Sequence, residues 1–85
     1  MSETNIFYPN NEISRHTLTH DKLINVLKSA DISLSEADDY ILSSEKSDKR
    51  GNTHRVYQHS YREVPVFGRF LRLHFDSDNI LKSLS

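Results

Sequence analysis

Residues 54–68, His-Arg-Val-Tyr-Gln-His-Ser-Tyr-Arg-Glu-Val-Pro-Val-Phe-Gly, decide the fold of this 85-residue chain. In the first part of this stretch one set of side chains alternates with another: Arg55, Tyr57, His59 and Tyr61 against Val56, Gln58 and Ser60. A period of two is typical of a β-strand whose two faces differ. Pro65 cannot donate to a ladder of backbone hydrogen bonds, so it should lie at a strand start, a bulge or an edge. The stretch therefore predicts two strands with a turn between them.

The predicted turn at Arg62 and Glu63 is unusual in composition. Neither residue favours the positive φ that a two-residue hairpin turn requires. We therefore expect either a longer loop or a two-residue turn that carries some strain.

The alternation resumes after Gly68 and predicts which face of the sheet is buried. One face carries Leu71, Leu73 and Phe75, and the other carries Phe70, Arg72 and His74. The first set is the better candidate for the face that a helix covers. A polar turn with Asp76, Asp78 and Asn79 follows, and then a short closing strand with Ile80, Leu81 and Leu84. The turn resembles the start of a calcium loop, but it lacks the following Gly and the distant Glu, so a hairpin turn is predicted.

The segment from residue 14 to residue 30 has the pattern of a short amphipathic helix. Thr19 or Asp21 can cap its start. Its apolar face, at helical spacing, comprises Leu23, Ile24, Leu27 and Ala30. Residues 35–38, Ser-Glu-Ala-Asp, resemble a capping box, so a second helical turn is expected there. The charged segment 45–52 lacks apolar residues and ends in Gly-Asn, which predicts a solvent-facing hairpin connection.

These elements predict an α+β domain, with one or two short helices packed on an antiparallel sheet of three to four strands. Residues 1–13 are expected to form a flexible N-terminal arm, and residues 14–85 a single domain. A chain of 85 residues can bury one modest core, but it is too short for a buried active-site cleft with its supporting residues. An enzyme is therefore a poor first interpretation, and no cofactor is expected.

Composition and charge exclude several classes of function. Charged residues are 27% of the chain and the formal net charge is −1, so no global field attracts nucleic acid or anionic lipid. The absence of Cys excludes disulfides and thiolate chemistry. No apolar run predicts a membrane span, and residues 1–5 have neither the basic nor the apolar region of a signal peptide. Either the protein acts in the cytoplasm or the chain begins after a removed signal.

Five histidines invite a zinc hypothesis. His16 and His20 are four residues apart, which would place them on one helix face, but they lack the intervening Glu and a third ligand. We therefore predict surface or cap-region histidines and no metal site. His54, His59 and His74 can lie on neighbouring strands and meet, either as an exposed cross-strand group or as a pH-sensitive patch.

Two further chemistries are disfavoured. No Ser or Thr lies in a nucleophile elbow, and a chain with two Gly has no phosphate-cradling loop. Arginines and aromatics interleave as in a stacking platform for single-stranded RNA, at Arg55, Tyr57, Tyr61, Phe70 and Arg72. The balanced charge argues against that function. We expect no nucleic-acid partner and assign these aromatics to the core and to interfaces.

From about residue 40 to residue 85 the chain resembles the FTP (fungalysin/thermolysin propeptide) module of zinc metallopeptidase precursors. The family pattern runs roughly H-x-R-[FY]-x-Q-x-Y-x-G-[IV]-P-V-[FY]-G, followed by an alternating strand that ends near H-x-D and then a turn. The matching positions are His54, Tyr57, Tyr61, Val64, Pro65, Val66, Phe67, Gly68, His74 and Asp76. Three positions depart from the pattern: Val56 replaces the Arg, His59 the Gln and Glu63 the turn Gly.

The resemblance implies a non-catalytic propeptide module that acts as intramolecular chaperone and inhibitor of a thermolysin-like metallopeptidase, in a secreted or periplasmic precursor. Its partner would be the peptidase catalytic domain, in cis or in trans. The motif residues are expected to be mostly architectural: Tyr57, Tyr61, Val64, Pro65, Val66, Phe67 and Gly68. The expected partner contacts are Arg62, Glu63, Arg69 and Arg72. The alternative is a free-standing protein-interaction or peptidase-inhibitor module that acts in trans in the cytoplasm. The oligomeric state stays open.

Overall fold

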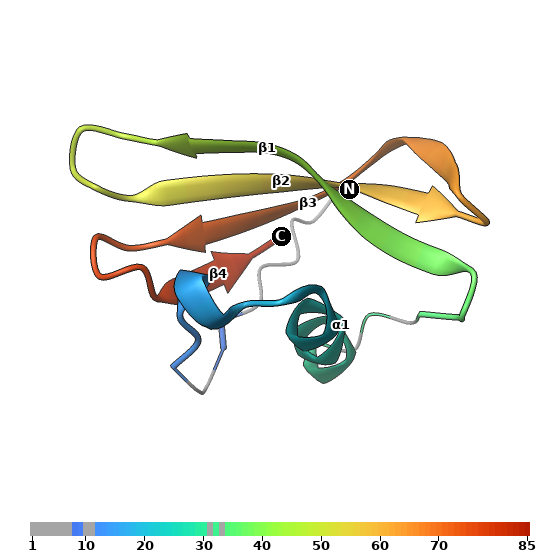
Figure 1. Ribbon diagram of the computed structural model, residues 1–85, viewed down its shortest axis with the longest axis horizontal. Helices are drawn as coiled ribbons and strands as arrows, with labels where there is room; N and C mark the ends of the chain where they lie inside the picture. The colour runs from blue at the N-terminus through green and yellow to red at the C-terminus, as the bar shows by residue number, and fades with distance from the viewer. Residues whose placement is uncertain (1–7, 10–11, 31, 33) are drawn as a thin grey trace, which may run out of the picture.

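One helix lies against one face of a four-stranded antiparallel sheet (Figure 1). The computed structural model describes residues 8–9, 12–30, 32 and 34–85. The elements are a 3₁₀ turn η1 (Arg15–Thr17), helix α1 (His20–Ser29) and strands β1 (Asp38–Ser47), β2 (Thr53–Tyr61), β3 (Val64–Phe75) and β4 (Leu81–Leu84). The strands follow one another in the sheet in chain order. The predicted α+β fold is confirmed. Most of the predicted N-terminal arm lies outside the described residues.

Helix α1 begins and packs as its sequence predicts. The hydroxyl of Thr19 accepts the backbone N–H of Lys22 at 3.3 Å, so Thr19 is the N-cap. Leu23 and Leu27 are fully buried one turn apart, and Ile24 and Ala30 pack against them from the same apolar face. The helix is therefore held by the sheet that its apolar face covers.

The core lies between α1 and the second half of the sheet. Every other residue at the end of β3 is buried, as the alternation predicts. The buried apolar residues of the sheet are Tyr57, Leu71, Leu73, Phe75, Leu81 and Leu84. Burying one Leu or Phe side chain contributes about 1.5–3 kcal/mol, so these few residues supply most of the driving force for folding.

Two of the three hairpin turns are held by an Asp side chain. The Oδ1 atom of Asp48 accepts the N–H groups of Arg50 and Asn52, at 2.8 and 3.0 Å. In the turn between β3 and β4, Asp76 Oδ1 accepts the N–H groups of Asp78 and Ile80 in the same way. These are turns in which a carboxylate replaces a backbone acceptor, and the predicted hairpin turn at Asp76 is confirmed.

The connection between β1 and β2 is shorter than predicted. Glu45, Lys46 and Ser47 pair with β2 as the end of β1, and the turn itself spans only residues 48–52. Charged side chains can occupy a strand where one face is open to solvent, so the absence of apolar residues in this segment did not mark a loop.

No second helical turn forms at residue 35 in the described structure. The carboxylate of Asp38 does accept the N–H and the hydroxyl of Ser35, at 2.9 and 3.0 Å, as a capping box would. The chain makes only a turn at residues 36–37, and β1 begins at Asp38. Because Asp38 also pairs with Tyr61 of β2, the sheet fixes it in an extended conformation.

The two edges of the sheet differ. Beside β4, the N–H of Leu81 donates to Ile13 O at 2.8 Å, and Ser14 forms a bridge with Ile80, so this edge is covered by the chain before α1. Strand β1 forms the opposite edge, and no described segment pairs with its outer side. The register of β1 shifts between Leu42 and Ser44, which places a bulge near the middle of that edge.

Candidate interaction site at the hairpin tip

The end of the β2–β3 hairpin, residues 61–70, is called the hairpin tip below (orange in Figure 1). Tyr61 pairs with Val64, so the turn contains two residues, Arg62 and Glu63. Both have positive φ, 51° and 68°, as a type I′ turn requires. For residues with a Cβ atom this conformation costs about 1–2 kcal/mol each. Of the two expected alternatives, the strained two-residue turn is the one that forms.

A bulge lies next to this turn. Gln58 pairs with Phe70 and Ser60 pairs with Pro65, so the four residues 66–69 of β3 stand opposite one residue of β2. The side-chain amide of Gln58 closes this loop: its Nε2 donates to Val66 O at 2.8 Å and to Arg69 O at 3.1 Å. A bulge of this kind re-aims side chains and increases local twist.

The bulge explains where the predicted alternation of β2 fails. The alternation predicted Ser60 on the face opposite Tyr57 and Tyr61, yet Ser60 is buried like Tyr57 while Tyr61 is exposed. The register between β2 and β3 shifts between Gln58 and Ser60, so the two ends of β2 do not share one pattern of faces.

The hairpin tip exposes most of its large apolar side chains. Phe67 is 101% exposed and Val64 63%, and Tyr61 and Phe70 are nearly half exposed. Among the described residues, only Tyr8, Ile41 and Leu42 are comparable exposed apolar side chains elsewhere. A group of apolar side chains left in water at one place is typical of a surface that binds a partner.

Three arginines lie within the hairpin tip or two residues after it. Arg62, Arg69 and Arg72 are exposed, and in the described part of the chain none of them has a carboxylate within ion-pair distance. The guanidinium of Arg62 lies 5.5 Å from the ring centre of Tyr61. Elsewhere Glu45 pairs with two arginines, because it bonds Arg55 at 2.8 Å and Arg15 at 3.4 Å. With Glu63 as its one acid, the tip and the adjoining Arg72 carry a net charge of +2, from three arginines less one glutamate.

The seven motif residues divide between core and surface. Tyr57 is buried and its hydroxyl accepts Arg55 Nη1 at 3.3 Å, and Val66 is half-buried. The other five are exposed, namely Tyr61, Val64, Pro65, Phe67 and Gly68. The sequence reasoning did not place Phe67 among the contacts. The available signal was Pro65 and Gly68 within four residues of one strand, which is typical of a bulge.

The strand histidines meet only in part. The Nδ1 atoms of His54 and His74 are 2.7 Å apart on neighbouring strands, so one ring donates to the other. His59 does not join them. Its Nε2 bonds Asp38 at 2.9 Å, and its ring stacks on Tyr40 with centroids 5.0 Å apart. His59 therefore connects β1 to β2 instead of joining the other two strand histidines.

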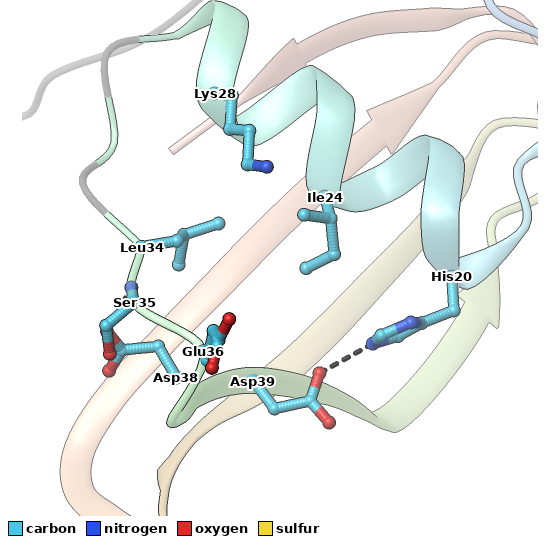
Figure 2. Close-up of a pocket in the computed structure, with 8 residues that line it drawn as sticks. All are labelled: His20, Ile24, Lys28, Leu34, Ser35, Glu36, Asp38 and Asp39. Carbon is cyan, nitrogen blue, oxygen red and sulfur yellow. Dashed lines mark hydrogen bonds and ion pairs between the residues drawn. The ribbon is translucent and has the colours of Figure 1, made fainter.

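A groove of about 340 Å³ lies between α1 and the start of β1 (Figure 2). Ile24 and Leu34 form its apolar side, and His20 points across to Asp39, which it contacts at 2.5 Å. The hydrogen bond from His20 lowers the pKa of Asp39, and bonds from Ser35 and then His59 lower the pKa of Asp38. Both carboxylates therefore accept hydrogen bonds that connect the start of β1 to α1, to the preceding turn and to β2.

The described residues show no metal-binding or membrane-spanning element. No group of three or more His, Cys, Asp or Glu side chains within residues 8–9, 12–30, 32 and 34–85 is arranged to hold a metal ion. His16 lies on η1 and His20 on α1, on separate elements rather than one helix face. Over the same residues, no helix has the length and apolar character needed to cross a membrane.

The fold and the hairpin tip together define a small α+β domain with a group of exposed apolar side chains at one end of its sheet. Residues 38–85, from the start of β1 to the end of the chain, match the family model of the Fungalysin/Thermolysin Propeptide Motif. The chain belongs to this family. A search of curated protein sequences found no match. Membership confirms the resemblance and indicates a propeptide role, a non-catalytic module and an association with a peptidase catalytic domain.

Proposed function

We propose that this domain is a propeptide module of a secreted or periplasmic thermolysin-like metallopeptidase precursor, where it assists folding of the catalytic domain and inhibits it. The family match over the whole sheet carries the proposal. The exposed hairpin tip supports it, because a propeptide acts through a surface that binds its peptidase and needs no reacting group.

Binding energy is sufficient for both roles. A ligand that binds only the folded catalytic domain stabilises it by about 2.7 kcal/mol when its concentration is about 100 times the Kd. A short covalent link gives an effective concentration of about 1 mM. A Kd of about 10 µM between module and catalytic domain would therefore suffice while the precursor is intact. Cleavage of the link removes this advantage and releases the enzyme.

We propose Arg62, Glu63, Arg69 and Arg72 as polar contacts to the peptidase. All four are exposed, and the arginines have no carboxylate partner among the described residues. Charged groups at the margin of an interface act mainly on association rate and orientation. Reversing two of these charges should therefore weaken binding without unfolding the domain.

The test measures refolding yield and inhibition of a thermolysin-like catalytic domain to which the module is added in trans. We expect the wild-type domain to raise the yield and slow the peptidase, and Arg69→Glu/Arg72→Glu to do both less well. Lys49→Glu/Arg50→Glu is the matched control, since it makes the same charge change at the opposite end of the sheet (Figure 1). No effect on any related metallopeptidase at high micromolar concentration, together with saturable binding of single-stranded RNA, would refute the proposal.

A further inference from the structure

We infer that Phe67 is the anchor by which the hairpin tip docks, and that it enters an apolar pocket bordered by carboxylates on the peptidase. This inference rests on the proposed function and adds the chemistry of the partner's surface. The starting observation is that Phe67 is 101% exposed, so its ring does not pack against the rest of the described domain. An aromatic ring that contributes nothing to the core is available for an interface.

The bulge holds Phe67 in a defined position. Val66 and Arg69, on either side of the two residues at its apex, are both bonded to the amide of Gln58. Gly68 has a φ of 75°, which a residue with a Cβ atom rarely adopts, and an added Cβ would meet nothing within 4 Å. The glycine is therefore required by the backbone and not by crowding. An apex fixed in this way loses less conformational entropy when it binds than a free loop would.

The rest of the hairpin tip matches an anchor surrounded by supporting contacts. Val64 and Phe70 are exposed on the same segment of β3 and extend the apolar surface on either side of the bulge. Binding hot spots are typically aromatic residues enclosed by contacts that exclude water. A partner that covers Phe67 would cover these two side chains as the enclosing contacts.

The positive charge of the hairpin tip and Arg72 indicates what kind of partner surface binds the tip. Arg62, Arg69 and Arg72 have no carboxylate partner within the described domain, and an acidic border on the partner would pair with them. An anionic membrane would also combine an apolar phase with negative charge. Recognition of such membranes typically uses clusters of about four to eight basic residues. Three arginines interrupted by Glu63 fall short of that, so a protein surface is favoured.

The experiment compares three single variants in binding to the same thermolysin-like catalytic domain, measured by calorimetry. Phe67→Ala should weaken binding by about 30-fold or more, the loss typical of a hot-spot residue. Gln58→Ala should weaken it less, because the ring is retained while its position is loosened. Leu42→Ala is the matched control: its side chain is 48% exposed but lies on β1 opposite Tyr57, on the face that α1 covers, so its affinity should stay within about 2-fold.

Three outcomes distinguish a failure of the Phe67 anchor from a failure of the proposed propeptide function. If Phe67→Ala binds as tightly as wild type while the wild-type domain still inhibits, the anchor is wrong and the propeptide role stands. If the wild-type domain neither binds nor inhibits any related peptidase, both fail. Binding to phosphatidylserine vesicles that Phe67→Ala abolishes, without binding to the peptidase, would assign the tip to a membrane and overturn the acidic pocket. Thermal unfolding of each variant checks that the domain remains folded.

Discussion

The two halves of β3 belong to one strand, but the first half is exposed and the second half contributes to the core. From Val64 to Phe70 six of seven residues are exposed, and from Leu71 to Phe75 every second residue is buried. The second half pairs with β2 in unbroken register beneath α1. Its alternate side chains therefore all point to one face and join the core. The first half contains the bulge, and no helix of the described structure covers it. Regular register thus produces stability in this domain, and its interruption produces the exposed surface.

The two ends of the sheet differ in the same way. The turn between β1 and β2 places Gly51 at its positive-φ position and satisfies its N–H groups with Asp48. The turn between β2 and β3 places Arg62 and Glu63 at positive φ, and Arg62 N donates to Ala37 O at 2.8 Å. The first turn has a glycine at its positive φ, whereas the second has residues with a Cβ atom there and retains strain.

The largest expected effect separates the halves of β3. Leu73→Ala removes a fully buried side chain and should lower the free energy of unfolding by about 2–5 kcal/mol. Phe67→Ala removes a fully exposed one and should change it by less than about 0.5 kcal/mol. Urea denaturation of both variants measures the difference. Equal changes in the two midpoints would mean that the buried and exposed halves have been assigned wrongly.

A smaller effect tests the strained turn. Glu63→Gly relieves a positive φ of 68° and should be neutral or stabilising, by up to about 1 kcal/mol. Gly51→Ala is the control of opposite sign, since it puts a Cβ atom at a φ of 86° and within 3.4 Å of the Ser77 Cβ. Thermal midpoints of the two variants give the comparison. Marked destabilisation by Glu63→Gly would show that the glutamate side chain makes a contact the domain needs.

The smallest expected effect is the pH dependence of stability that comes from the pair His54 and His74. Burial, then His54 and Arg72, lower the pKa of His74 below its usual 6.5. The folded state therefore binds fewer protons at His74 than the unfolded state, so this contribution is present above pH 6.5 and is lost as the pH falls through the lowered pKa. Asp48 is the carboxylate on the far side of the pair, 3.7 Å from His54.

Stability measured by urea denaturation between pH 7 and pH 5 should fall for the wild type and fall less for His74→Gln. His16→Gln, a change at an exposed residue outside the sheet, should follow the wild-type curve. Parallel curves for wild type and His74→Gln would show that the pair does not couple proton binding to folding.

The predictable part of this fold is the part that depends on local periodicity. The apolar face of α1, the buried face of the second half of β3 and the Asp76 turn were each evident within about ten residues of sequence. The first two patterns repeat at the period of their own element and the turn is set by its own Asp side chain, so no knowledge of a distant partner was needed.

The unpredicted features depend on contacts between segments. The bulge is closed by Gln58, which bonds carbonyls eight and eleven residues away, and nothing in the spacing of Gln58 indicates these bonds. Ser60 is buried and Phe67 is exposed as its consequence. Likewise, pairing with Tyr61 draws Asp38 into β1, although its local sequence favoured a helix start. The arginines could be predicted as exposed, but their lack of carboxylate partners is a property of the folded domain.

The outer edge of β1, with which no described segment pairs, bears on how copies of the domain behave at high concentration. An uncovered strand of this length is a template for pairing with the strand of another molecule, which is how ordered aggregates begin. The bulge between Leu42 and Ser44 breaks the straight row of hydrogen-bonding groups, and the charges of Glu45 and Lys46 stand beside it. These features disfavour aggregation along the edge, so the domain can expose its apolar hairpin tip without also offering a flat strand to its neighbours.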